Sequence, residues 1–224
     1  MKGRLLYLTV SMILLLGLYP FLETTSLGNI ILNVLISVVC LTAVYVVSNN
    51  KINLAIALIL GVPWFMITWL NLVREKHFSV FGYAAIILLV LFYLFTAIAI
   101  LRFILKSTKI TKDLLFGVVS VYLLTGGTFS MIYLLIETIS PGSFFINPEM
   151  NINGILDGSD FIYFSFVTLT TLGYGDIIPV SSVARSFSMI EAIIGVMYLA
   201  IIISRTVGMF LSQTKTNENS ISEE

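Results

Sequence analysis

The stretch TLTTLGYGDI, residues 168–177, is polar and glycine-rich, and it lies between two long apolar segments. At membrane depth, non-helical backbone is stable only where protein buries it or where it lines a watery cavity. Gly173 and Gly175 are separated by one residue, and glycine adopts positive φ at little steric cost, so the strand can turn successive carbonyls to one side. Aligned carbonyl oxygens can replace the hydration shell of a cation. The stretch therefore predicts a cation-binding segment inside a membrane.

The composition indicates that the bilayer is the main solvent of this chain. Of its 224 residues, 58% are hydrophobic and 11% are charged, whereas soluble domains carry about 25% charged residues. Cys40 is the only cysteine, which excludes an intrachain disulfide and a cysteine-based metal cluster. The net charge is zero and gives no reason to expect a nucleic-acid partner. Membrane lipids are the expected surroundings.

Six apolar segments are long enough to span a hydrocarbon core of about 30 Å as helices, which takes roughly 20 residues each. They are residues 5–22, 27–47, 52–73, 80–101, 114–136 and 183–211. The first segment follows Lys2 and Arg4 and could instead be a secretory signal peptide. Its length and the lack of a clear A-x-A cleavage site favour a retained spanning helix.

The basic residues in the short connections predict that both termini are cytosolic, because such residues accumulate on the inner side. Nine are then inside: Lys2, Arg4, Lys51, Arg102, Lys106, Lys109, Lys112, Arg205 and Lys215. Three remain outside: Arg74, Lys76 and Arg185.

The connection 137–182 then faces outward. Its first part, residues 140–160, has the Pro, Gly and Asn content of an exposed turret. Asp160 is the predicted N-cap of a short helix over 161–171 that re-enters the membrane. At the other end of the chain, the polar residues 213–224 are expected to be disordered.

Residues 168–176 resemble the selectivity filter of potassium channels, whose usual form is T-x-T-T-V-G-Y-G-D. Seven positions match: Thr168, Thr170, Thr171, Gly173, Tyr174, Gly175 and Asp176. Leu172 stands where the family usually has Val or Ile, and a side chain without β-branching holds the strand less stiffly. The resemblance extends over about residues 114–211 and implies an outer helix, a pore helix, a filter and an inner helix.

The resemblance also implies roles for individual residues. Potassium, the only metal expected, binds to oxygens of the filter, mostly backbone carbonyls, and no cofactor is expected. The ion-binding residues are Thr171, Leu172, Gly173, Tyr174 and Gly175. Thr168, Thr170 and Asp176 support the filter, and Asp176 anchors its outer mouth. One chain supplies one filter strand, so a closed ring of carbonyls requires a homotetramer.

Three further residues are candidates for support or gating. The Tyr163 hydroxyl is placed to brace Asp176 from behind. Gly195 lies where the family often has a hinge glycine in the inner helix, although glycine in membrane helices is also a packing residue. Glu191 lies on the same helix face as Gly195. It either hydrogen-bonds behind the filter or lines a water-filled cavity, and we favour the first alternative because buried acids need partners.

The sequence thus predicts an all-α membrane protein of six spanning helices with a re-entrant pore segment before the last. Residues 1–112 form a peripheral four-helix domain, 113–212 the pore domain and 213–224 a cytosolic tail. Voltage sensing needs basic residues within the membrane field, and the fourth segment, 80–101, has none. Strong voltage gating is therefore not expected.

The expected function is passive, potassium-selective conduction in a plasma membrane, of prokaryotic type. The alternative is a weakly selective monovalent cation channel with the same pore. A carrier often contains inverted repeats, and the chain has no second copy of the pore segment. An enzyme would need a nucleophile, a base or a metal cluster, which the apolar segments do not supply, so neither an enzyme nor a small-molecule substrate is expected.

Overall fold

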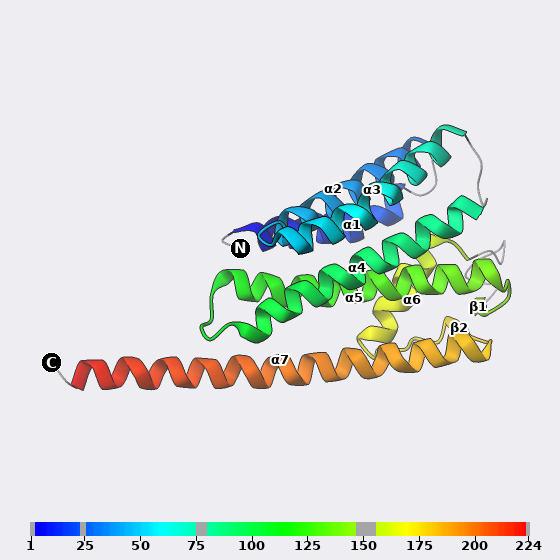
Figure 1. The fold of residues 1–224 in the computed structure, drawn as a ribbon. Helices are drawn as coiled ribbons and strands as arrows, with labels where there is room; N and C mark the ends of the chain where they lie inside the picture. Colours follow the sequence, from blue (N-terminus) through cyan, green and yellow to red (C-terminus); the bar gives the residue numbers. More distant parts are fainter. Residues whose placement is uncertain (1–2, 23–25, 75–79, 147–155, 223–224) are drawn as a thin grey trace.

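The computed structural model describes residues 3–22, 26–74, 80–146 and 156–222. Within these ranges the chain forms seven helices and two short strands (Figure 1). In chain order they are α1 (Arg4–Leu22), α2 (Ser26–Val47), α3 (Lys51–Arg74), α4 (Val80–Lys106), α5 (Lys112–Ile139), β1 (Phe144–Ile146), α6 (Gly158–Leu169), β2 (Ile177–Pro179) and α7 (Ser182–Ser222).

Each of the six predicted apolar segments coincides with one long helix. Five helices, α2, α3, α4, α5 and α7, are long and apolar enough to cross a membrane, and a shorter apolar helix covers Arg4–Tyr19. The chain is accordingly a multi-pass membrane protein. Lys2 and Lys76, which contribute to the predicted orientation, lie outside the described residues.

The mostly helical structure agrees with the predicted all-α class, and one expectation from the sequence needs correction. The structure adds a small two-stranded antiparallel sheet of β1 and β2 that pairs Phe145 with Ile178. Three residues per strand are too few for an alternating pattern to be visible in the sequence. The C-terminal tail is not disordered up to Ser222, because α7 continues to that residue. Residues 212–222 contain neither glycine nor proline, the usual helix terminators.

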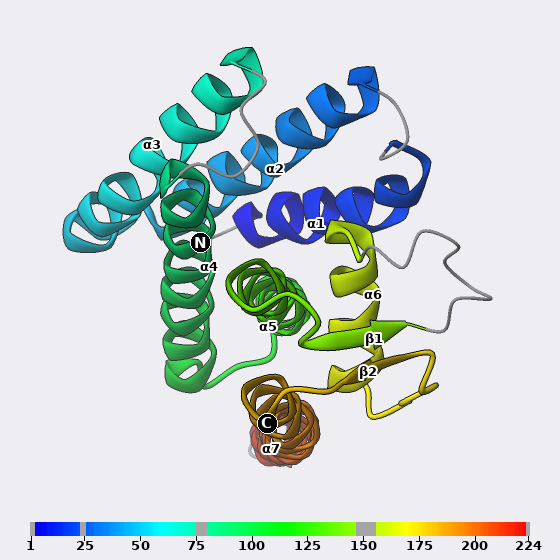
Figure 2. The ribbon, with the colours of Figure 1, turned by 90° about the vertical axis from the view of Figure 1, so that its right-hand side faces the viewer.

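Helix α5 is the centre of the molecule. Viewed end-on, it is surrounded by α1, α4, α6 and α7, while α2 and α3 lie further out (Figure 2). Helix α3 contacts α4 and α2. The fold therefore has an inner group built around α5 and an outer pair of helices.

The first described residues, the α4–α5 connection and the second half of α7 lie at one end of the bundle (Figure 1). The Gly3 N–H donates to Asp113 Oδ1 at the start of α5, at 2.8 Å. Arg205 Nη2 of α7 donates to the carbonyls of Leu105 at 2.5 Å and Ser107 at 3.0 Å, where α4 ends. Both described ends of the chain thus lie at the same end of the bundle, and their cytosolic location stays a prediction.

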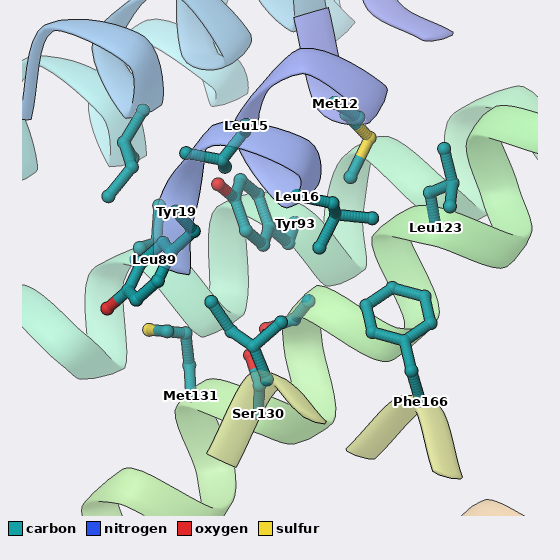
Figure 3. Close-up of a pocket in the computed structure, with 13 residues that line it drawn as sticks. Met12, Leu15, Leu16, Tyr19, Leu89, Tyr93, Leu123, Ser130, Met131 and Phe166 are labelled. Atoms are coloured by element: carbon teal, nitrogen blue, oxygen red, sulfur yellow. The ribbon is translucent and has the colours of Figure 1, made fainter. Parts of the chain in front are cut away.

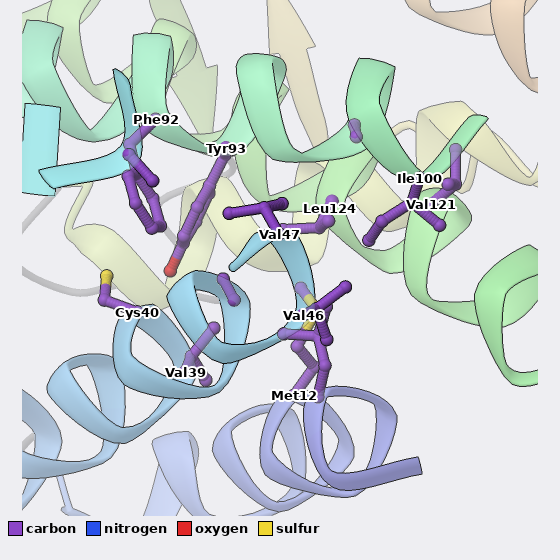
Figure 4. Packing of buried hydrophobic residues seen from close by; sticks show 14 of the residues in the cluster. Met12, Val39, Cys40, Val46, Val47, Phe92, Tyr93, Ile100, Val121 and Leu124 are labelled. Atoms are coloured by element: carbon purple, nitrogen blue, oxygen red, sulfur yellow. The ribbon is translucent and has the colours of Figure 1, made fainter. Parts of the chain in front are cut away.

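The larger hydrophobic core joins α1, α2, α4 and α5 (Figure 4). Helix α4 contributes buried residues at helical spacing, among them Phe92 and Ile100, which is the pattern of a helix with one face in a core. Polar contacts accompany this packing: the buried Thr9 and Ser120 hydroxyls lie 2.8 Å apart and join α1 to α5. Helices α1 and α4 therefore pack directly against α5, and α2 and α3 pack against these two helices.

Candidate functional site

Helix α6 begins with a complete capping box. The Asp157 carboxylate accepts from the N–H groups of Ser159 at 2.9 Å and Asp160 at 3.2 Å, while the Asp160 carboxylate accepts from the Asp157 N–H at 3.0 Å. The N-cap is thus Asp157, and the prediction of Asp160 was wrong by one turn. Gly158 and Ser159 join the first turn, which places Asp160 at the third helical position, where an acid can bond back to the N-cap backbone.

An aromatic cluster holds α6 against its neighbours. Tyr133 of α5, Phe144 of β1 and Phe164 of α6 form edge-to-face pairs with ring centroids 5.0–5.4 Å apart. Phe161 of α6 packs edge-on against Phe144 at 5.2 Å. Such pairs stabilise packing by about 0.5–1.5 kcal/mol beyond the buried area. The small sheet therefore belongs to the site, because β1 supplies the ring at the centre of this cluster.

A glycine in α5 lets α6 approach closely. A Cβ atom at Gly126 would lie 2.7 Å from the Phe166 ring, so any larger residue would require this ring to move. The same ring borders a cavity of about 60 Å³ between α1, α4, α5 and α6 (Figure 3). Met12 and Tyr93 line it from the peripheral helices. One side of α6 thus packs against α5 and borders a cavity that peripheral helices also line.

Where α6 ends, backbone N–H groups turn back towards the helix. The Thr171 N–H donates to the Thr168 carbonyl at 2.9 Å. The N–H groups of Leu172 and Gly173 both donate to the Val167 carbonyl, at 2.9 and 3.3 Å. Three consecutive donors are used on the helix side, so the start of the 171–175 segment is fixed to the C-terminus of α6.

The backbone of residues 171–175 alternates in handedness. Positive φ angles occur at Thr171 (59°), Gly173 (58°) and Gly175 (79°). Leu172 and Tyr174, between them, do not share this conformation, since Thr171 is the one described non-glycine residue with positive φ. Reversing every second residue removes the usual alternation of peptide planes along a strand, so successive carbonyls can face one side.

Thr171 stores backbone strain in this arrangement. A left-handed conformation costs a residue with a Cβ atom roughly 1–2 kcal/mol, and such outliers persist where the surrounding structure enforces them.

All five residues of the segment are exposed in the single chain, with Leu172 at 55% and Tyr174 at 67%. No donor among the described residues reaches their carbonyl oxygens.

Asp176 and Tyr163 close the outer end of the segment. The Tyr163 hydroxyl donates to Asp176 Oδ2 at 2.5 Å, so the contact expected from the sequence is present. The other oxygen of Asp176 accepts the N–H of Ile177 at 2.9 Å. The rings of Tyr163 and Tyr174 are stacked, with centroids 6.5 Å apart.

Helix α7 packs behind the segment at Gly195. A Cβ atom there would lie 2.0 Å from the Leu169 carbonyl oxygen of α6. Helix α7 is continuous through this position. Gly195 therefore has the packing role of a small residue at a helix crossing, and its function as a hinge stays a prediction.

Glu191 lies one turn before Gly195 and is fully buried. Its two carboxyl oxygens lie within hydrogen-bonding distance of the hydroxyls of Tyr133 of α5 and Ser165 of α6, each at 2.5 Å. Of the two alternatives from the sequence, the burial and the contacts agree with the first in that Glu191 bonds to the helices around it. Its effect on the filter is untested.

The remaining predicted support residues, Thr168 and Thr170, make local hydrogen bonds at the C-terminus of α6. The Thr170 hydroxyl donates to the Phe166 carbonyl at 2.7 Å, within its own helix, and Thr168 contributes its carbonyl to the turn at Thr171. Tyr133, Ser165 and Gly126 were missed by the sequence analysis. The glycine pair at 126–127 inside an apolar segment was the available signal, because small residues mark close helix contacts in membranes.

Comparisons with known proteins find an ion-channel family and two relatives that are named as potassium channels. The ion-channel family model matches residues 117–212, which includes most of α5, all of α6 and α7 up to residue 212. The chain is 31% identical over 101 residues to the inward rectifier potassium channel Kirbac3.1 of Paramagnetospirillum magnetotacticum, covering 43% of this chain and 30% of that one. No solved structure matches.

Two further relatives align over parts of the chain. Protein LctB of Bacillus caldotenax is 32% identical over 100 residues, which cover 44% of this chain and 74% of LctB. Two-pore potassium channel 4 of Arabidopsis thaliana is 40% identical over 53 residues, which cover 24% of this chain and 19% of the plant protein. The chain thus spans less than a third of two of these relatives and about three quarters of the third.

Proposed function

This chain belongs to the potassium-channel superfamily, and we propose that four copies of it form a channel through which potassium ions flow passively across a cell membrane. The family is one of ion channels and not of enzymes. The observation that carries the proposal is the backbone of residues 171–175, whose positive φ angles recur at every second residue. Carbonyls that face one side are the ligands that a dehydrated monovalent cation requires.

The two ends of α6 have different positions in the proposed pore. Helices α1 to α5 and α7 span the membrane, and α6 enters it from the outer side and ends at Leu169, at the inner end of the filter. The carbonyl end of a helix carries partial negative charge, so α6 would favour a cation at this position. Asp176, held by Tyr163, then lies at the outer mouth.

One chain cannot complete this site. The carbonyls of 171–175 have no donor among the described residues, and lipid cannot satisfy them. The exposed filter side must therefore face an aqueous axis that other copies surround. A cyclic arrangement of four identical chains gives each ion a ring of carbonyls. Kirbac3.1 and the plant relative are named as potassium channels, which supports the same ion for this chain.

Selectivity for potassium over sodium is the finer part of the proposal. The Thr171 hydroxyl and the carbonyls of residues 171–175 are the proposed ligands. Leu172 lacks β-branching, and its side chain is 55% exposed in the single chain, so in the assembly neighbouring subunits would have to hold it in place. A filter that is less stiff at this position is the basis of the alternative, a weakly selective monovalent cation channel.

Ion flux into vesicles that contain the purified chain tests the proposal. We expect potassium flux well above sodium flux, blocked by barium and abolished by Gly173→Asp. Gly142→Asp is the matched control, because Gly142 also has positive φ and open space around it but lies in a turn outside the filter. Equal potassium and sodium fluxes would favour the alternative, and the absence of any cation flux would contradict both.

A further inference from the structure

Glu191 is an acid buried in an apolar part of the molecule without a cationic partner. Its side chain is 0% exposed, and it lies in α7 between α5 and α6. Among the described residues, its two carboxyl oxygens contact the hydroxyls of Tyr133 and Ser165, and no lysine, arginine or histidine. Burying an ionised carboxylate without a cation is strongly unfavourable. The surroundings therefore favour a neutral acid.

A count of the hydrogens in this cluster also indicates that Glu191 is neutral. Three short contacts form a chain: Tyr133 to Glu191 Oε2 at 2.5 Å, Glu191 Oε1 to Ser165 at 2.5 Å, and Ser165 to the Gly126 carbonyl at 2.8 Å. A carbonyl can only accept, so the single Ser165 hydrogen belongs to the contact with Gly126. The hydrogen between Ser165 and Glu191 must then come from Glu191.

We propose that Glu191 carries a proton at neutral pH and is a positioning residue for the filter. Its O–H donates to Ser165, whose own O–H donates to the Gly126 carbonyl, and its second oxygen accepts from Tyr133. In this state each of the three contacts has one hydrogen. With an ionised Glu191, two hydrogens would have to serve three contacts, and a buried acceptor would lose its donor.

The network connects α7 and α5 to the base of the filter. Ser165 lies two residues before Val167, whose carbonyl accepts the N–H groups of Leu172 and Gly173. One turn along α7, Gly195 packs against the Leu169 carbonyl. The acid and the glycine thus hold the last two turns of α6 from the same helix. The positioning role rests on the proposed function, because it concerns the conducting filter.

Infrared spectroscopy of the full chain in lipid tests the proton directly. We expect the carbonyl-stretch band of a protonated carboxylic acid at neutral pH, and we expect Glu191→Gln to remove it. Glu137→Gln is the matched control and should keep the band, because Glu137 accepts from the backbone N–H groups of Gly142 and Phe144 and not from the Tyr133 and Ser165 network. A spectrum in which Glu191→Gln removes no such band overturns the proposal.

Flux measurements on the same variants test the positioning role. Glutamine supplies an N–H donor and a carbonyl acceptor in nearly the shape of the neutral acid, so Glu191→Gln should keep potassium selectivity close to that of the unmodified chain. Glu191→Asp, which is too short to reach both hydroxyls, should lower the potassium-to-sodium ratio by about tenfold, the effect of losing one buried hydrogen bond. Ser165→Ala should give a loss of similar size and keeps the proposal testable if Glu191→Asp does not assemble.

The outcomes separate this inference from the proposed function. If the unmodified chain conducts no potassium, the proposed function fails, while the infrared band still decides the protonation state. If the unmodified chain is selective but Glu191→Gln loses selectivity and Glu191→Asp keeps it, a charged carboxylate is required. That result would overturn the inference alone.

Discussion

Helices α3 and α7 are both largely exposed within one chain, yet they have different neighbours. In their apolar spans, 11% of Lys51–Asn71 and 17% of Ser182–Leu211 are buried. Helix α3 contacts α2 and α4, whereas α7 packs against α5 and α6, beside the exposed segment 171–175. Exposure alone does not tell whether a membrane helix faces lipid or another protein chain. The unpaired polar backbone beside α7 does, because lipid cannot satisfy it.

The comparison predicts that α3 and α7 have different surroundings in the membrane. Lipid suits the exposed side chains of α3, most of which are large and apolar. In the proposed tetramer, α7 and the 171–175 segment would instead face the other three copies and the ion path. Matched substitutions in the two helices can therefore test this assignment.

The largest effect is expected where α7 meets α6. Gly195→Ala would place a Cβ atom 2.0 Å from the Leu169 carbonyl oxygen, and forced overpacking costs about 1–3 kcal/mol, occasionally more. We expect a lower melting temperature of the assembly and the loss of potassium flux. Gly208→Ala, in the same helix but with open space around it, should change neither. Normal flux in Gly195→Ala would show that the close contact does not position the filter.

A matched pair of isoleucines compares the two helices directly. Ile59 of α3 is 68% exposed and Ile193 of α7 is 63% exposed within one chain. Replacing each with tryptophan should leave the assembly intact at Ile59, where lipid adapts to the larger ring. At Ile193 the ring must fit between copies or into the pore, and we expect the tetramer to be destabilised by about 1–3 kcal/mol. Size-exclusion chromatography in detergent measures both, and equal behaviour would remove the distinction.

The smallest effect is expected at the outer end of the filter. Tyr163→Phe removes the hydrogen bond to Asp176, a change of about 1 kcal/mol. We expect faster loss of current during sustained opening, with selectivity largely kept, in recordings from planar bilayers. Tyr7→Phe, on an exposed face of α1, is the control. Unchanged kinetics in Tyr163→Phe would contradict a bracing role for this hydroxyl.

Helix positions and family were predictable from the sequence for a simple physical reason. A span of about 20 apolar residues is a local property, and each predicted segment lies in one long helix. The filter motif is also local, and the resemblance to potassium channels is confirmed at the level of the family. The roles of the individual filter residues remain predictions.

The features that sequence reasoning missed depend on distant contacts or on choices among similar residues. Glu191 bonds to Tyr133 and Ser165, which are 58 and 26 residues away in the sequence, so no local pattern identifies them. The N-cap of α6 was misplaced because Asp157 and Asp160 are both suitable caps, and the turn geometry decides between them. The sheet pairs residues on the two sides of the filter, and this depends on how α6 folds back.

The most direct test of the central claim is native mass spectrometry of the chain released from lipid nanodiscs. The account predicts one main species at four times the 24.9 kDa of a single chain, because only a closed ring of four can cover the carbonyls of residues 171–175. A main species of one or two chains would contradict it.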